Sequence, residues 1–320
     1  IHLKNLKPLP AADEIVDKCI ECGFCEPVCP SKGLTLSPRQ RIVMWRDIQA
    51  KKRAGVDTTA LERDYQYQGI DTCAATGLCA QRCPVGINTG ELVKKLRAQA
   101  ASHVKTADWL AEHFHTALSG ARLTLRAANG ARRLLGAPRL ARISQSLSKA
   151  SNGRLPLWTP AMPQPLQPIQ FSPASNDARP RVVYLAACVS RVMGPAAGDR
   201  EQTSLLDKTR GLLEKAGYQV VFPENQDSLC CGQPFASKGY PEQAEHKRQE
   251  LITALLHASR GGLDPIYCDT SPCTLRLVQD LSDTRLDLYD PVRFIRTHLL
   301  DRLEFTPQDE PVAVHVTCST

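Results

Sequence analysis

The side chains best suited to chemistry in this sequence are cysteines, and four of them lie close together near its start. They are Cys19, Cys22, Cys25 and Cys29, spaced Cys-x2-Cys-x2-Cys-x3-Cys, with Pro30 directly after. Thiolates at this spacing bind the irons of a cubane cluster, and the fourth thiolate of such a run ligates a neighbouring cluster. Zinc sites more often present two separated Cys-x2-Cys pairs. The run therefore predicts an iron–sulfur cluster.

A second cysteine run supplies the other half of this site. It reads Cys73-x5-Cys79-x3-Cys83 and is followed by Pro84. Superposed on the first run, it would carry a further ligand at position 76, where the sequence has Thr76. A degraded site without metal is one explanation. The intact Cys-Pro-Val-Gly-Ile-Asn-Thr-Gly ending of the run argues against that explanation.

The crossed arrangement of ligands predicts which cysteines share a cluster. The first cluster, of the [4Fe–4S] type, takes the thiolates of Cys19, Cys22, Cys25 and Cys83. The second cluster takes the thiolates of Cys29, Cys73 and Cys79. Three thiolates fit a [3Fe–4S] cluster, and they also fit a [4Fe–4S] cluster whose last iron takes water, Thr76 or a distant residue.

Length and composition limit the class of protein. The chain has 320 residues, enough for about two domains with buried cores. Its 13 cysteines are clustered, which favours metal binding in a reducing, cytoplasmic compartment over a disulfide framework. The sequence has no secretory signal pattern and no apolar run long enough to span a bilayer. Because it starts at Ile1 and stops at Thr320, just after Cys318, we expect a fragment of a longer protein.

The first part of the chain, residues 1–112, reads as a helical domain. Pro38 suits the first turn of a helix, and Asn88 suits the cap of another helix that has Glu91 in its first turn. No alternating strand pattern occurs before residue 155. We therefore expect an all-α domain that holds its clusters in the turns between helices.

The next segment, residues 113–154, carries eight Arg or Lys residues and no Asp or Glu. A solvated basic helical arm is the simplest interpretation. The alternative is a docking surface for an acidic partner or anionic lipid, with a peripheral contact at the inner face of the cell membrane. Nucleic-acid binding is not expected, because aromatic interleaving and a reader motif are missing. A proline-rich linker follows at residues 155–180.

Residues 181–320 read as a second domain of a different kind. Strand-like and helix-like segments alternate along it, strand first, at 181–188, 199–217, 218–223, 241–259 and 265–268. This alternation predicts an α/β domain with a parallel sheet. Residues 311–318 resemble residues 181–188, which indicates an internal repeat whose second copy is truncated.

Four further cysteines lie where the loops of such a sheet gather functional groups. They are Cys188, Cys230, Cys231 and Cys273. If they converge at the strand ends, they would bind an iron–sulfur cluster or zinc; the alternative is two buried structural cysteines and two free ones. A turn at the following glycine would bring the adjacent pair onto one site. Cys268 lies within a predicted strand and reads as a core residue.

These motifs together resemble known redox proteins. The first half is similar to the two-cluster α-helical ferredoxin module, and its second run is similar to that of succinate dehydrogenase iron–sulfur subunits, whose three matching cysteines hold a [3Fe–4S] cluster. The second half, with Cys-Cys-Gly-Gln-Pro-Phe and Asp-Thr-Ser-Pro-Cys, resembles the cysteine-rich CCG domain of heterodisulfide reductase and glycolate oxidase iron–sulfur subunits. With Pro-Arg-Gln-Arg-Ile added, the whole resembles the C-terminal part of FAD-linked D-lactate dehydrogenases.

The resemblance implies an oxidoreductase in which FAD, held by an upstream domain, oxidises a D-2-hydroxy acid, D-lactate first and D-2-hydroxyglutarate next. This chain would carry no catalytic residue of that oxidation. It would carry electrons from the flavin domain to a quinone or another respiratory acceptor. The sequence departs from the usual CCG pattern at Thr270, which occupies the first position of the closing Cys-x2-Cys.

Two other classes remain open. In one, the chain is a separate iron–sulfur subunit of a glycolate-oxidase or heterodisulfide-reductase type of complex. In the other, the cysteines hold structural zinc and the protein is an interaction scaffold.

Overall fold

The computed structural model describes residues 11–169, 178–280, 285–307 and 309–314, which form two compact units. The first unit comprises the chain up to Val104 together with Pro234–Gln243, and the second comprises Lys105–Gln233 with most of the chain from Ala244 onward. The segment Pro234–Gln243 therefore packs with the first unit, although it lies far along the sequence.

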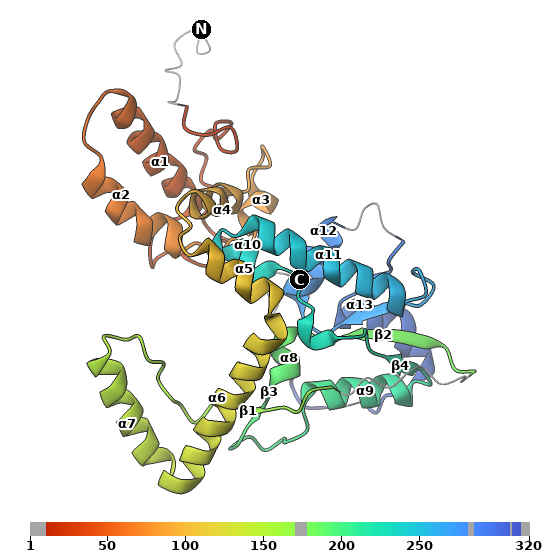
Figure 1. Ribbon diagram of the computed structural model, residues 1–320. Coiled ribbons are helices and arrows are strands. Elements are labelled where there is room, and N and C mark those ends of the chain that lie inside the picture. Colours follow the sequence, from red (N-terminus) through yellow and green to blue (C-terminus); the bar gives the residue numbers. More distant parts are fainter. Residues whose placement is uncertain (1–10, 170–177, 281–284, 308, 315–320) are drawn as a thin grey trace. The chain divides into compact units, whose positions relative to one another are not determined.

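The first unit is helical, as the sequence predicts (Figure 1). Its helices are α1 (Pro38–Arg53), α2 (Thr59–Tyr65), the π-helical η2 (Gln66–Asp71), α3 (Leu78–Arg82), α4 (Thr89–Gln99) and, from the later segment, α10 (Gln233–Lys238). They enclose a core of Val16, Ile42, Ile48, Tyr65, Ile70, Ile87, Leu92, Val93 and Leu96. Cys19, Cys73 and Cys83 pack against this core, so the cysteine loops lie on its edge.

Both predicted helix starts in this unit are confirmed. Ser37 caps α1 in a capping box with Gln40, and Pro38 is at the first turn. At the start of α4, the side chain of Asn88 accepts a hydrogen bond from the backbone N–H of Gly90, 3.0 Å away. These caps stabilise the first turns of α1 and α4, which follow the two cysteine runs, and so set where each cysteine loop ends.

The second unit contains a parallel sheet with the strand order β4-β2-β5-β6. The strands are β2 (Arg181–Leu185), β4 (Gln219–Val221), β5 (Ile266–Cys268) and β6 (Leu288–Tyr289). The helices that accompany them are α8 (Cys188–Val192), α9 (Leu205–Lys215), α11 (Pro241–Ala258), α12 (Ser271–Asp280) and α13 (Pro291–Phe294). Short 3-10 or π-helical segments also occur in this unit: η3 (Gln226–Ser228), η4 (Ile295–Leu299) and η5 (Leu300–Arg302). The predicted mixed fold is confirmed.

Both faces of the sheet are covered, which explains why its strands read as continuous apolar runs. Val183 and Leu185 of β2 pack with Leu251 and Leu255 of α11. The alternate residues Val182 and Tyr184 belong to a second core with Leu213 of α9 and Phe294 of α13. Successive side chains of a strand point to opposite faces, so each strand contributes to two apolar cores.

Further helices precede this sheet in the chain. They form α5 (Val104–Glu112), α6 (Phe114–Leu135) and α7 (Ala137–Ala150). Within the proline-rich segment, β1 (Pro163–Pro165) pairs antiparallel with β3 (Met193–Ala196). No helix in the described part of the chain is both long and apolar enough to cross a membrane.

The predicted internal repeat can be compared with the structure only in part. Residues 311–314 form no strand among the described residues, and Cys318 lies outside them.

Candidate metal centres

The structure brings the four predicted ligands of the first cluster to one cavity in the first unit. Cys19, Cys22, Cys25 and Cys83 all line it. The remaining walls include Ile42 of α1 and apolar residues of the second cysteine loop. Burial raises the pKa of the Cys25 thiol to about 11. A cation that displaces the proton would compensate this cost, which fits a thiolate ligand of iron.

Two side chains of the first helix hold the first cysteine loop in place. Arg46 is buried; its Nη1 donates to Glu21 Oε1 at 2.8 Å, and its Nη2 donates to the carbonyl of Cys19 at 3.0 Å. Arg39 Nε donates to Glu26 Oε1 at 3.0 Å. A hydrogen bond from Ser37 at 2.6 Å and the guanidinium of Arg39 lower the pKa of Glu26. Two ion pairs, Arg46–Glu21 and Arg39–Glu26, therefore connect helix α1 to the first cysteine loop.

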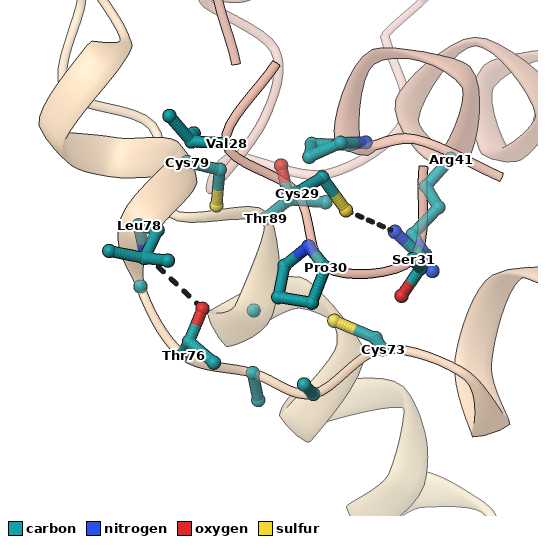
Figure 2. A pocket seen from close by; sticks show the side chains of 15 residues that line it. Val28, Cys29, Pro30, Ser31, Arg41, Cys73, Thr76, Leu78, Cys79 and Thr89 are labelled. Atoms are coloured by element: carbon teal, nitrogen blue, oxygen red, sulfur yellow. Dashed lines mark hydrogen bonds between the residues drawn. The ribbon is translucent and has the colours of Figure 1, made fainter. Parts of the chain in front are cut away.

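The three predicted thiol ligands of the second cluster line a separate cavity. Figure 2 shows Cys29, Cys73 and Cys79 around this cavity, together with Thr76. The hydroxyl oxygen of Thr76 lies 3.5 Å from the backbone N of Leu78. The predicted ligands thus gather into two sites, one with four thiols and one with three thiols and a hydroxyl.

Arg41 of α1 forms part of the wall of this second cavity (Figure 2). Its side chain is 1 % exposed. Nε donates to the carbonyl of Gly69 at 2.7 Å, and Nη2 lies 3.3 Å from Thr72 Oγ1. Nη1 lies 3.7 Å from Cys29 Sγ.

Arg41 makes no ion pair with a carboxylate among the residues that the structure describes. A buried charge without a counter-ion is costly. An anionic thiolate-bound cluster would supply that counter-ion, so the residues present fit an iron–sulfur group.

Arg97 of α4 is hydrogen-bonded to the backbone at the start of the second cysteine loop. Nη2 donates to the carbonyls of Ile70 at 2.6 Å and Cys73 at 2.7 Å, and Nη1 donates to the carbonyl of Ser237 at 2.7 Å. Gly239 (φ +88°) lets the later segment approach this closely, since a Cβ there would lie 2.5 Å from the carbonyl carbon of Arg97. Sequence reasoning missed Arg41, Arg46 and Arg97. An arginine at an otherwise apolar position of a helix that follows a cysteine run would have indicated these buried residues.

The structure also brings the four candidate cysteines of the second unit to one cavity. Cys188 begins α8 after β2, and Cys273 lies in α12 after β5. The cavity is lined by these two together with Cys230 and Cys231. Cys231 Sγ and Cys273 Sγ are 3.3 Å apart. Gly232 (φ +80°) is required here, because a Cβ would lie 2.2 Å from the carbonyl oxygen of Ala244.

Arg191 contributes a positive charge to this third cavity. It is 2 % exposed, and its Nη2 donates to the carbonyl of Leu229 at 2.7 Å. Its Nε and Nη1 have no hydrogen-bond partner among the described residues. A hydrogen bond from Cys230 and the charge of Arg191 lower the pKa of Cys188 to about 7. These features suit an anionic, thiolate-bound group.

Cys268 packs in the apolar core beside this site, as predicted, and burial raises its pKa to about 12. Thr270 stands at the position where the usual CCG pattern has a cysteine, and the thiols that line the cavity are those of Cys188, Cys230, Cys231 and Cys273. The hydroxyl of Thr270 donates to Asp269 Oδ1 at 3.0 Å. Within the described residues, no group of three or more His, Cys, Asp or Glu side chains has the arrangement of a single-ion metal site.

Two separate stretches of the chain match known domain families. Residues 15–87 match the family described as 4Fe-4S dicluster domain, and residues 182–277 match the family described as cysteine-rich domain. The chain therefore combines an iron–sulfur dicluster domain with a cysteine-rich CCG domain, and no solved structure matches it.

Three relatives illustrate the similarity. Over 109 residues, the chain is 31 % identical to a subunit of the dihydromethanophenazine:CoB–CoM heterodisulfide reductase of Methanosarcina mazei and 28 % identical to the same subunit of the Methanosarcina barkeri enzyme. This region is 30 % of the chain and 26 % of either relative. Over 77 residues, 24 % of the chain, it is 38 % identical to the uncharacterized protein YkgE of Escherichia coli, covering 30 % of that protein. The chain thus spans well under half the length of these relatives.

Proposed function

We propose that this chain is the iron–sulfur electron-transfer part of an FAD-linked D-2-hydroxy acid dehydrogenase, with D-lactate as the first candidate substrate. The observation that carries the proposal is the pair of cavities, each lined by one of the two ligand sets that the crossed spacing predicts. The match of residues 15–87 to a dicluster domain supports the same assignment.

In this proposal Cys19, Cys22, Cys25 and Cys83 hold a [4Fe–4S] cluster. Cys29, Cys73 and Cys79 hold the second cluster, for which we propose the [3Fe–4S] form because Thr76 offers a neutral hydroxyl where a fourth thiolate would stand. Bound clusters would supply one-electron carriers, which take the two electrons of a reduced flavin one at a time and pass them on. The protein's own part is to exclude water, hold the thiolates and balance their charge.

The donor and the acceptor lie outside this chain. We propose a flavin domain encoded upstream as the donor and a quinone or another respiratory carrier as the acceptor, at the inner face of the cell membrane. The clustered reduced cysteines suit a reducing compartment.

For the second unit we propose a metal site at Cys188, Cys230, Cys231 and Cys273. Their shared cavity and the incompletely bonded guanidinium of Arg191 support an anionic metal–thiolate group there. The match to the cysteine-rich domain family is consistent with this role.

A second candidate function is a separate subunit of a heterodisulfide-reductase type of complex. The similarity to a subunit of that enzyme in Methanosarcina mazei favours it. The coding sequence upstream of Ile1 discriminates between the two: a flavin-binding domain in the same reading frame supports the dehydrogenase, and a start codon close to Ile1 supports the separate subunit.

The ligand assignment is tested with two reciprocal variants. Cys83→Ser should remove or destabilise the first cluster and spare the second, whereas Cys29→Ser should do the reverse, as seen by electron paramagnetic resonance (EPR) of the oxidised and reduced proteins. The crossed assignment is wrong if Cys83→Ser depletes only the second cluster. If the parent protein itself shows no cluster signal in either state, the proposed function fails as well.

A further inference from the structure

Helices α6 and α7 form a helical hairpin whose far end carries unusual side chains. One residue, Gly136 (φ +77°), separates the two helices, and Pro138 lies in the first turn of α7. A positive φ of this kind suits glycine and allows the sharp reversal. Figure 1 shows α6 and α7 meeting at this corner. We call residues 132–142 the hairpin tip.

The near end of α6 is anchored in the second unit. Phe114 is buried, and Lys247 Nζ lies 5.6 Å from the centre of its ring. Arg122 is buried as well; Nη1 and Nη2 bond both carboxylate oxygens of Asp227, each at 2.8 Å. Arg122 is therefore a structural residue and not one of the free cations of the basic segment. The first part of α6 is thus fixed by Phe114 and Arg122, and the hairpin tip lies at the other end of the helix.

The hairpin tip exposes large apolar side chains. Leu134 and Leu135 are the last two residues of α6, and they are 87 % and 40 % exposed. Ile143 and Leu147 of α7 are exposed as well. Among the described elements, α7 packs mainly against α6. A single exposed leucine needs no explanation, but several on one projecting element indicate an interaction site.

Basic residues flank these leucines in the sequence. Arg132, Arg133, Arg139 and Arg142 all lie within the tip, and residues 113–154 contain no acidic residue. None of the four arginines forms an ion pair with a residue that the structure describes. Arginine binds phosphate oxygens through its planar fork of N–H groups, which makes it better suited than lysine to phosphate-bearing headgroups.

We infer that the hairpin tip docks the protein on an anionic phospholipid surface, with Leu134 and Leu135 inserted among the acyl chains and the arginines at the phosphates. A few exposed leucines at a helix turn can insert into a lipid bilayer, because lipids rearrange around them. A stable protein–protein interface, in contrast, usually buries about 800 Å² on each partner. Leucines with flanking arginines match the pattern of interfacial membrane helices. This inference does not depend on the cluster assignment.

The test uses the full chain and vesicles of phosphatidylcholine with or without phosphatidylglycerol, separated by flotation. We expect binding only to the anionic vesicles and weaker binding as salt rises, because exposed charges are screened within about 10 Å at 0.1 M salt. Arg133→Gln/Arg139→Gln should weaken partitioning roughly fivefold for each charge removed. Leu134→Ser/Leu135→Ser should weaken it by about tenfold or more.

Matched controls separate the tip from general surface effects. Leu263→Ser removes another leucine, 77 % exposed, and Arg210→Gln removes another exposed arginine; both should bind as the parent protein does. Circular dichroism of every variant checks that the fold is kept. The inference is overturned if the parent protein fails to float, if the tip variants float equally well, or if only soluble polyglutamate is bound, which would indicate an acidic protein partner instead.

Discussion

Arg41→Gln offers the sharpest test of how the protein balances the charge of the second cluster. The change removes a buried positive charge whose Nη1 lies 3.7 Å from Cys29 Sγ. At that distance two unit charges interact by about 4 kcal/mol at an effective dielectric constant of about 20. For a one-electron couple, about 4 kcal/mol corresponds to about 170 mV.

The full value is an upper bound, because the added electron spreads over cluster atoms more distant than the cysteine sulfur. We therefore expect Arg41→Gln to lower the reduction potential of the second cluster by roughly 50–150 mV. Arg41→Lys keeps the charge and should shift the potential less, although it loses the forked bonds to Gly69 and Thr72.

The assay is a potentiometric titration followed by EPR, with both clusters read in each variant. Arg39→Gln on the same helix is the matched control, since Arg39 is paired with Glu26 beside the first cavity. It should leave the potential of the second cluster unchanged. An unchanged potential in Arg41→Gln, or equal shifts of both clusters, would refute the charge-balance reasoning.

Two further predictions concern Thr76 and the anchor of α6. Thr76→Cys completes the second ligand run and should convert an EPR-visible oxidised [3Fe–4S] centre into a silent [4Fe–4S] centre of lower potential; a parent protein that is already silent when oxidised contradicts the three-iron assignment. Arg122→Leu leaves Asp227 without its bidentate partner and should lower the free energy of unfolding by about 2–4 kcal/mol. Arg126→Leu loses, among the residues that the structure describes, a bond to Gln167 and is the control for thermal or denaturant unfolding; equal stabilities of the two variants would argue against the anchor.

The ligand sets could be predicted from the sequence because their spacing is local. A run such as Cys19 to Cys29 folds around a cluster over a few turns, so ligand identity follows from residue spacing. The parallel sheet was predictable for a similar reason, because fully buried strands such as Arg181–Leu185 are short apolar runs between helices. Both predictions rest on patterns shorter than about twenty residues.

The side chains that support the site could not be predicted this way. Arg97 bonds Cys73 and Ser237, which are far apart in the sequence, and its role exists only once the segment Pro234–Gln243 has packed on the first unit. Arg122 looked like one member of a solvated basic segment. Its burial depends on Asp227, whose proximity no local pattern reveals.

The central claim is that the first unit binds two iron–sulfur clusters, and the most direct measurement is the iron, acid-labile sulfide and zinc content of the anaerobically purified protein, combined with EPR. We expect a brown protein whose first unit holds about seven or eight iron atoms and a similar amount of sulfide, with two distinguishable EPR centres. A colourless protein that holds zinc and no labile sulfide would show that the first unit binds no iron–sulfur cluster.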